Sequence, residues 1–331
     1  MKCAKLSCTV FFSVFFLVVV MKQQAEMAEV QDNYKILINI PARSLALYEG
    51  EERVRLYPVA LGKPYTQTPV GYYKIRTKEK NPSWIDPGNP KNVIYSGPTN
   101  PLGYRWMQIQ GNYGIHGTNK PSSIGKFDSN GCIRLKEEQV EELFDLVKIG
   151  TPVEIMYNRV VIDMLKNNMI TYYIYPDAYD KQALDVTTVK QWLTGYGIEN
   201  FESDADILSK IKRSDGKPTY IGKIYPLEVN GAELSHKVVD KNDILYLPVQ
   251  EIADYLGTSI VWNGEEGTAS SAYGTVPVTD RNGTLYIQSE DAEVLFHRYG
   301  YLNDTRVYVI GKSKQSPVMA PSSISKESNE R

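Results

Sequence analysis

Two short stretches decide how this chain folds and where its chemistry lies: Ile115-His116-Gly117-Thr118 and Ser129-Asn130-Gly131-Cys132-Ile133-Arg134-Leu135. A thiol is a useful nucleophile only as its thiolate, and a neighbouring imidazole can take its proton. The chain has three histidines, and of these only His116 lies in the same predicted domain as Cys132. The two stretches therefore predict a cysteine nucleophile, Cys132, with His116 as its base, while the residues alone leave a buried, inert cysteine open as the alternative.

The residues around this pair suit the same chemistry. Gly117 and Gly131 flank the reactive groups, where a bulkier side chain would obstruct the approach of the backbone or strain the turn. Backbone N–H groups near Cys132 could then face a tetrahedral oxyanion. Arg134 supplies a fixed positive charge that orients a substrate carboxylate or supports the thiolate. A plain ion pair with a nearby acid is an equally ordinary role for this arginine, so the sequence leaves both open.

The sequence predicts a helix directly after the second of these stretches. Apolar residues at the i, i+3, i+4, i+7 spacing of one helical face predict a helix over residues 136–147: Val140, Leu143, Phe144 and Val147. Acidic residues concentrate near its start, where the helix dipole favours them. We interpret the acidic run from Glu137 to Glu142 as a solvated helix face. Gly150 ends the helix, and residues 151–155 predict a closing strand.

Upstream of the motifs, residues 33–75 predict β-structure. Residues 34, 36, 38 and 40 are apolar or aromatic and alternate with others, which is the period of two expected of a strand with one buried face. Two further strand candidates flank Glu49-Gly50-Glu51-Glu52 and predict a hairpin with a four-residue loop. After another strand at 72–76, residues 78–103 are rich in Pro, Gly and Asn and predict a long loop that serves as a lid or substrate wall.

The second half of the chain predicts smaller elements. These are a strand at 170–175, helices at 186–193 and 204–211, and a strand at 244–249 that leads into a helix at 249–256. Asn-Gly pairs at 263–264 and 282–283 stand beside strand candidates and are typical of hairpins. The tail from residue 312 is rich in Ser, Pro and Lys, which predicts disorder.

The N-terminus predicts export. Two lysines precede an apolar run from Leu6 to Met21, the pattern of a secretory signal peptide. The run falls a little short of the about 20 apolar residues that a spanning helix needs, and the sequence leaves a cleaved signal and an uncleaved anchor both open. Cys3 and Cys8 lie in this segment, so Cys132 is the one cysteine of the predicted mature protein and a disulfide within it is ruled out.

The composition is that of an ordinary globular protein. Of its residues, 42% are hydrophobic and 23% are charged, so a substantial core can form. The length of 331 residues predicts two folded units. A formal net charge of -2 gives no reason to expect nucleic-acid binding. The sequence offers no cluster with metal-ligand spacing, so we expect neither a metal nor an organic cofactor. His236 and His297 are interpreted as surface or packing residues.

The two opening stretches resemble the active-site signature of the L,D-transpeptidase catalytic domain, a His-Gly-Thr element followed by Ser-x-Gly-Cys-Ile/Val-Arg. The resemblance covers about residues 34–156 and includes Thr68-Pro69-x-Gly71 and Gly150-Thr151-Pro152-Val153. Many family members carry His where this chain has Asn130, but the family's catalytic histidine is the upstream one and matches His116. The resemblance implies a mainly β fold, an L,D-transpeptidase-type β-sandwich of mixed sheets with one helix, followed by a small α+β domain.

The resemblance also implies a reaction, acyl transfer on the stem peptides of peptidoglycan. Cys132 would attack the carbonyl of the third residue of a tetrapeptide stem, release D-alanine, and pass the thioester to an amine of a neighbouring stem. His116 would act as base and then as acid, with its ring oriented by the backbone carbonyl of Gly131. The implied substrate-binding residues are Arg134, Ser129, Gly117, Thr118 and Asn130.

Two other functions stay open. If water captures the thioester, the enzyme is an L,D-carboxypeptidase; a fold that has lost turnover would be a non-catalytic protein that binds the cell wall. An intact Cys–His pair favours an enzyme, because a binding module has little need for a reactive thiol outside the cell. The residues do not decide between amine and water as acceptor, nor do they give the third stem residue or the oligomeric state.

A second resemblance concerns the C-terminal half. Val229-Asn230-Gly231, Leu245-Tyr246-Leu247-Pro248-Val249 and Val261-Trp262 are similar to the N-terminal-type domain first named from copper amine oxidases. Despite that name the module implies no copper here, and we interpret it as an accessory domain that faces the wall or acts as a spacer.

The predicted organisation combines these parts. It comprises a signal peptide or N-terminal anchor at 1–28, a catalytic domain at 33–158, a mixed connector at 159–222, a copper amine oxidase N-terminal-like accessory domain at 223–312, and a disordered tail at 313–331. We expect an exported protein, on the outer face of the cytoplasmic membrane or in the cell wall, that touches the membrane only through an uncleaved anchor.

Overall fold

The computed structural model describes residues 33–311, which divide into two compact units with the boundary between Asn158 and Arg159. The predicted signal peptide or anchor and the predicted disordered tail lie outside the described residues. Within residues 33–311, the helices are all too short or too polar to cross a membrane.

The first unit is built on a five-stranded sheet. In β1 the alternation predicted from the sequence is confirmed, because Ile36 and Ile38 are fully buried while Lys35 is exposed. The predicted closing strand is also confirmed: β13 pairs in parallel with β1, whereas the other strands of this sheet are antiparallel. The sheet has the order β3-β2-β1-β13-β5, with bounds β1 Tyr34–Asn39, β2 Ser44–Glu49, β3 Glu52–Pro58, β5 Gly71–Lys74 and β13 Pro152–Met156.

A four-stranded sheet carries the two motifs. One of its faces is the core face, on which Met107, Ile115 and Ile133 are fully buried. The sheet has the order β12-β10-β9-β6, with bounds β6 Thr77–Lys80, β9 Arg105–Gln110, β10 Tyr113–His116 and β12 Ile133–Arg134. A small parallel pair lies beside it, formed by β4 Leu61–Gly62 and β11 Phe127–Ser129, and a short 3-10 turn, η1, spans Pro121–Ser123.

The predicted helix is confirmed as α2, Glu137–Leu146. Its apolar face buries Val140, Leu143 and Phe144, as the spacing requires. Its polar face contacts both sheets through side-chain hydrogen bonds and an ion pair. Glu142 accepts hydrogen bonds from side chains of β3, and Glu141 lies 3.2 Å from the guanidinium of Arg105 on β9. Between residues 33 and 158 the unit is therefore mainly β, with mixed sheets and one α-helix, as expected.

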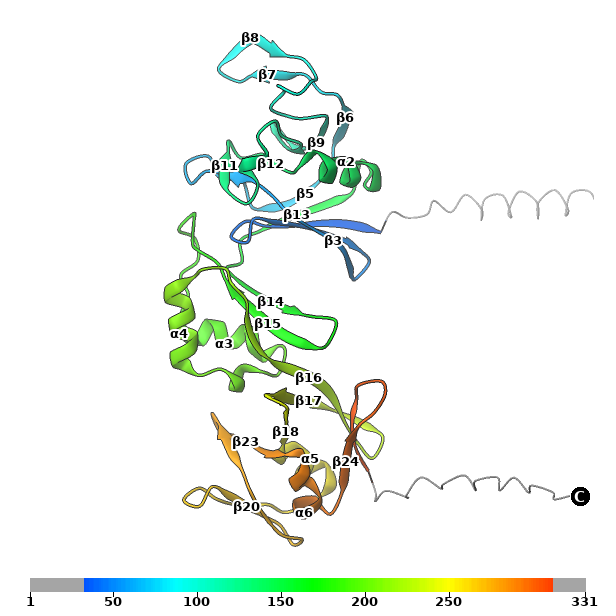
Figure 1. The fold of residues 1–331 in the computed structure, drawn as a ribbon, viewed down its shortest axis with the longest axis vertical. Helices are drawn as coiled ribbons and strands as arrows, with labels where there is room; N and C mark the ends of the chain where they lie inside the picture. The colour runs from blue at the N-terminus through cyan, green and yellow to red at the C-terminus, as the bar shows by residue number, and fades with distance from the viewer. Residues whose placement is uncertain (1–32, 312–331) are drawn as a thin grey trace, which may run out of the picture. The chain divides into compact units, whose positions relative to one another are not determined.

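Two details of the first unit differ from the sequence-based expectation. The loop between β2 and β3 contains two residues, Gly50 and Glu51, because the strands extend further than predicted. The segment 78–103 is not a continuous loop: it continues β6 and then forms the hairpin β7 Trp84–Asp86 and β8 Asn89–Ile94. Figure 1 shows this hairpin projecting from the first unit at the end away from β3.

The second unit is organised by one long, mostly antiparallel sheet. Its main path is β14-β15-β16-β17-β18-β23-β22, and β25 pairs in parallel with β16. The strand bounds are β14 Val160–Met164, β15 Met169–Ile174, β16 Thr219–Val229, β17 Ala232–Lys241, β18 Ile244–Pro248, β22 Thr279–Arg281, β23 Thr284–Gln288, β24 Tyr299–Leu302 and β25 Tyr308–Gly311. A separate three-stranded sheet contains β19 Val261–Asn263, β20 Thr268–Ser270 and β21 Thr275–Pro277.

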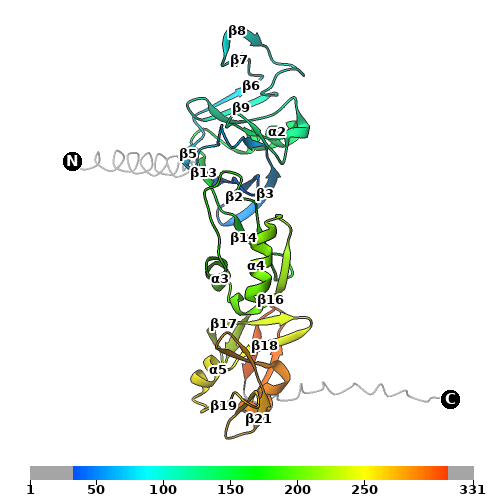
Figure 2. The same ribbon diagram turned by 90° about the vertical axis from the view of Figure 1, so that its left-hand side faces the viewer.

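Helices pack against this sheet in two groups. In both views α3 and α4 lie beside the β14–β15 part, where they share one apolar cluster with these strands (Figures 1 and 2). A second cluster involves α5 and α6. The helix bounds are α3 Val186–Thr194, α4 Asp204–Arg213, α5 Val249–Leu256 and α6 Ala292–Phe296, with 3-10 turns η2 Glu199–Phe201 and η3 Ser289–Asp291.

The predicted helices at 186–193, 204–211 and 249–256 are confirmed, as is the hairpin at Asn282-Gly283, where both residues have positive φ. The predicted boundary at residue 222 falls inside β16. The division into a connector and an accessory domain stays a prediction.

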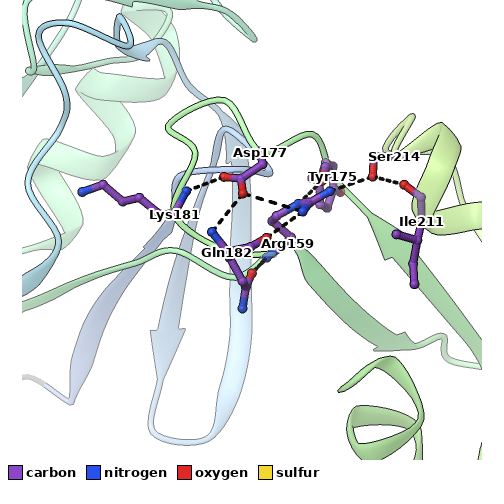
Figure 3. A network of polar contacts seen from close by, with 7 residues as sticks. All are labelled: Arg159, Tyr175, Asp177, Lys181, Gln182, Ile211 and Ser214. Atoms are coloured by element: carbon purple, nitrogen blue, oxygen red, sulfur yellow. Dashed lines mark hydrogen bonds and ion pairs between the residues drawn. The ribbon is translucent and has the colours of Figure 1, made fainter. Parts of the chain in front are cut away.

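A buried arginine organises the start of the second unit (Figure 3). Arg159 is 8% exposed, and its guanidinium donates to the carbonyls of Tyr175 and Gln182 and to Ser214 Oγ at 2.6–2.9 Å. The carboxylate of Asp177 lies 3.7 Å away. Because a planar guanidinium offers several donors in fixed directions, one side chain joins three separate segments here.

We expect Arg159→Ala to lower the free energy of unfolding of this unit by about 3 kcal/mol, because it removes the guanidinium donor of several buried acceptors and the charge partner of Asp177. Arg213→Ala is the matched control: its side chain is 55% exposed, and its loss should cost less than about 0.5 kcal/mol. Hydrogen exchange of the β15 amides as a function of urea measures both. Equal losses in the two variants would show that the Arg159 network does not stabilise the unit.

Candidate active site

The register of the four-stranded sheet places the two reactive side chains on one face. β10 and β12 pair in parallel, with Ile115 opposite Ile133 and His116 opposite Arg134. Successive side chains of a strand point to opposite faces. Since Ile115 and Ile133 point into the core, His116, Arg134 and the preceding Cys132 point the other way. All three line a cleft of about 840 Å³, together with Ser129 and Asn130.

His116 is a buried, neutral imidazole. The ring is 3% exposed, and its Nδ1 atom lies 2.6 Å from the carbonyl oxygen of Gly117. A carbonyl can only accept, so Nδ1 carries the proton and Nε2 keeps its lone pair. Burial, reinforced by the charge of Arg134, lowers the pKa of His116 to about 3, although backbone hydrogen bonds with Gly117 and Leu102 oppose the shift. Nε2 can therefore accept a proton at neutral pH.

The backbone contact of the histidine corrects one expectation. The carbonyl that holds the ring belongs to Gly117, not to Gly131. The carbonyl of Gly131 instead accepts a hydrogen bond from Thr68 Oγ1 at 3.0 Å. Gly131 serves the site through its conformation: its φ is +110°, and a Cβ there would lie 2.5 Å from the ring of Tyr113.

Cys132 is half-buried and reaches the cleft. Its thiol lies 3.4 Å from the carbonyl oxygen of Asn112. Burial raises the pKa of this thiol, against the opposing effects of a backbone hydrogen bond with Gly114 and the charge of Arg134. Burial thus favours the neutral thiol at Cys132, as it favours the neutral imidazole at His116.

The loop that carries Cys132 is held by two buried hydroxyls. Ser129 Oγ accepts from the N–H of Gly131 at 3.1 Å and donates to the carbonyl of Cys132 at 2.6 Å. Thr68 Oγ1 accepts from the N–H of Gly62 at 2.9 Å while it donates to Gly131. The Gly131 N–H, one of the donors expected to face an oxyanion, is thus occupied by Ser129. A substrate contact for Ser129 stays a prediction.

Arg134 is half-buried and faces the cleft. One of its terminal nitrogens donates to the backbone carbonyl of Asp128 at 3.2 Å. The carboxylate of Asp128 is itself 2.8 Å from the ammonium group of Lys120. Burial lowers the pKa of Arg134, but a guanidinium stays charged at any physiological pH. Its role toward a substrate stays a prediction, as does that of the exposed Asn130.

Gly117 and Thr118 do not line the cleft; they belong to a clamp behind it that the sequence did not reveal. Glu137, at the start of α2, accepts from the N–H of Thr118 at 2.6 Å and from that of Tyr104 at 3.0 Å. A Cβ at Gly103 or Gly117 would lie within 2.0 Å of its carboxylate. The interpretation of Glu137 as part of a solvated helix face is therefore wrong. Its carboxylate instead fixes the turn at Gly117 and Thr118, and the carbonyl of Gly117 contacts the ring of His116. Glutamate at a helix start is the only signal that the sequence offered, because Glu137 lies 19 residues after Thr118.

Two tryptophans also line the cleft. Trp84 belongs to the β7–β8 hairpin, and the ring of Trp106 lies 5.6 Å from that of His116. A Cβ on Gly114 would be 2.6 Å from the indole of Trp106, so the indole lies over a position that only glycine can fill. Both indole rings therefore belong to the wall of the cleft. Across residues 33–311, His, Cys, Asp and Glu side chains do not gather into a group that could hold a metal ion.

The clamp gives a testable prediction. Glu137→Gln should speed hydrogen exchange of the Tyr104 and Thr118 amides by roughly tenfold, because a neutral acceptor holds an N–H less strongly and the new amide group points a donor at another donor. Glu138→Gln, which removes an exposed carboxylate one residue away, should leave both amides unchanged. If both variants protect these amides equally well, Glu137 does not hold the turn.

The fold and the site together define a class of protein: a β-rich unit whose cleft is lined by a cysteine and a buried, neutral histidine. Comparison with known proteins shows which family within this class the chain resembles. Residues 33–155 match the L,D-transpeptidase catalytic domain family, YkuD. YkuD of Bacillus licheniformis is 41% identical over 123 residues, which are 37% of this chain and 65% of that protein. YqjB of Bacillus subtilis is 37% identical over 124 residues, 36% of this chain and 68% of that protein.

The names of both relatives class them with the L,D-transpeptidases. Among solved structures, an L,D-transpeptidase from Mycobacterium smegmatis aligns with 38% of this chain and 58% of its own, at 20% identity and a TM-score of 0.32. The match to YqjB spans more than two thirds of that relative, and the match to YkuD slightly less. The chain belongs to the L,D-transpeptidase catalytic domain family through its first unit.

Proposed function

We propose that this chain is a peptidoglycan L,D-transpeptidase with Cys132 as nucleophile and His116 as general base and acid. The observation that carries the proposal is the placement of both side chains on one face of the β10–β12 pair, in a cleft large enough for a peptide. The family relation supports the same reaction. Its substrates would be the stem peptides of peptidoglycan.

In the acylation step, Cys132 Sγ attacks the carbonyl carbon of the third residue of a tetrapeptide stem. Its proton passes to Nε2 of His116 as the C–S bond forms, which avoids building a thiolate in a site that disfavours one. When the tetrahedral intermediate collapses, the bond to D-alanine breaks and the imidazolium returns the proton to the leaving amine. Charges and protons balance without a cofactor.

In the second step the thioester passes to an acceptor. An amine of a neighbouring stem gives a cross-link, and water gives the trimmed stem of an L,D-carboxypeptidase. His116 takes a proton from the attacking group and gives it to the departing Cys132. Arg134 and Asn130, which line the cleft with Cys132, are proposed to contact the substrate, while Ser129, Gly117 and Thr118 act by shaping the loops that hold the reactive pair.

The proposal includes a place of action. The basic and apolar start of the sequence supports export, with residues 1–28 as a cleaved signal or an anchor. The enzyme would then work outside the cytoplasmic membrane, where peptidoglycan lies. The second unit would serve as an accessory module that spaces the catalytic unit or contacts the wall, as its resemblance to the copper amine oxidase N-terminal-type domain implies.

A direct assay tests this function. The chain without its first 28 residues is incubated with a purified disaccharide-tetrapeptide, and the products are followed by mass spectrometry. We expect loss of D-alanine with dimer formation. Cys132→Ala should abolish both, and His116→Gln should slow them by at least about 100-fold because it removes the general base.

Loss of D-alanine without dimers would identify a carboxypeptidase. The absence of turnover and of any Cys132 adduct, with the thiol reduced and several stem types supplied, would overturn the catalytic proposal in favour of a wall-binding protein.

A further inference from the structure

The cleft floor contains a row of four side chains that runs straight across the four-stranded sheet. Arg134 on β12 pairs with His116 on β10, His116 pairs with Trp106 on β9, and Trp106 pairs with Glu79 on β6. Residues that face each other across neighbouring strands point to the same side of the sheet. All four of these residues line the cleft.

The row is electrically polarised. It has a guanidinium at one end and a carboxylate at the other, with the histidine and the tryptophan between them. Strands lie about 4.8 Å apart, so the backbone of Glu79 is about 10 Å from that of His116 and about 14 Å from that of Arg134. The side chains of all four residues rise from the same face of the sheet, so a ligand bound at Glu79 lies over the cleft floor, on the side of His116 away from Arg134.

The negative charge at this end is not neutralised by its sequence neighbours. Lys78 and Lys80 point to the opposite face, where Lys78 Nζ donates to the carbonyl of Phe144 at 2.5 Å and Lys80 lies 3.9 Å from Asp145. Glu79 is exposed. Among the hydrogen bonds and ion pairs of residues 33–311, its carboxylate takes part in none.

The other acidic residue that lines the cleft, Asp86, already accepts hydrogen bonds within the protein. Asp86 accepts hydrogen bonds from the N–H of Gly88 at 2.9 Å and from the side chain of Asn92 at 3.3 Å, which stabilise the β7–β8 hairpin. Glu79 is therefore the carboxylate of the cleft that is available to a ligand.

We propose that Glu79 binds the primary ammonium group of the acceptor stem, which makes the Glu79 end of the row the acceptor side and the Arg134 end the donor side. This inference rests on the proposed function and adds to it the residue that selects an amine over water. Trp106 lies between Glu79 and His116 and offers an apolar and aromatic surface over which an aliphatic amine can extend toward the thioester.

The chemistry balances. The bound ammonium gives one proton to solvent, and the neutral amine attacks the carbonyl carbon of the Cys132 thioester. A second N–H proton passes to Nε2 of His116, the C–S bond breaks, and the imidazolium protonates the departing sulfur. Glu79 acts by raising the local concentration of the ammonium form and orienting it, so it is a specificity residue and takes no part in bond making.

The test measures how the thioester is partitioned between acceptors. The chain without its first 28 residues is given disaccharide-tetrapeptide as donor and acceptor, and the ratio of dimer to hydrolysed stem is measured. Glu79→Gln should lower this ratio roughly fourfold, the size expected of one exposed ion pair. Glu79→Lys should lower it further, by roughly tenfold, because attraction becomes repulsion. Glu138→Gln, an exposed acid on the far face, should leave the ratio unchanged.

Three readouts separate a specific role of Glu79 from a general defect of the cleft. The rate of D-alanine release should be unchanged in Glu79→Gln, because acylation does not involve the acceptor. Capture by hydroxylamine, which is uncharged at pH 7.5, should also be unchanged. Added salt should lower the dimer ratio of the wild type more than that of Glu79→Gln, since screening acts on the charge that the variant lacks.

The outcomes distinguish this inference from the proposed function. If the wild type releases no D-alanine, the proposed function fails. If the wild type forms dimers and Glu79→Gln forms them in the same ratio, the acceptor role of Glu79 is overturned while the function stands. An equal loss of dimer formation and hydroxylamine capture would also overturn it, because it would show a damaged cleft.

Discussion

The parallel pairing of β10 with β12 is the constraint on which the active site depends. It joins two strands whose buried isoleucines, Ile115 and Ile133, anchor the core face. A slip of one residue would turn the isoleucines to solvent and the reactive groups into the core. Hydrophobic burial therefore fixes the register, and the register presents Cys132, His116 and Arg134 to the same cleft. The contacts of Thr68, Ser129 and Glu137 then set the loops on either side of this pair.

The electrostatics of the pair follow from the same burial. A site that lowers the pKa of His116 and raises that of Cys132 disfavours charge on both groups. The neutral pair costs the folded protein no buried ions at neutral pH. Acidification has a defined effect: below the unfolded histidine pKa of about 6.5, the unfolded chain binds a proton that folded His116 refuses until about pH 3. The contribution of His116 to stability is complete above pH 6.5 and is lost as the pH falls through this window.

The sequence revealed the parts of this protein that depend on residue type and local spacing. Cys132 and His116 stand out because of their chemistry, and β1 and α2 because of their periodicity. The ring contact of His116 was assigned to the wrong glycine because the direction of a carbonyl depends on backbone dihedrals, which residue identity does not give. Glu137 resembled a surface acid because its partners are backbone N–H groups, which every residue has.

Other features depend on pairings between distant strands. The row from Arg134 to Glu79 exists only through the registers of three strand pairs, and none of these registers can be read from local sequence. The β7–β8 hairpin was hidden by its Pro and Gly residues, which indicated a loop. Its strands, Trp84–Asp86 and Asn89–Ile94, are too short to carry a long alternating pattern.

The protonation state of His116 is the most direct test of this account. Nitrogen NMR of the labelled imidazole, with His236 and His297 replaced so that one ring remains, reports both ring nitrogens as a function of pH. We predict a neutral ring with its proton on Nδ1 from pH 8 down to about pH 4, in keeping with a pKa of about 3. A doubly protonated ring at pH 7 that becomes neutral in Cys132→Ala would reveal a thiolate–imidazolium pair and contradict the account.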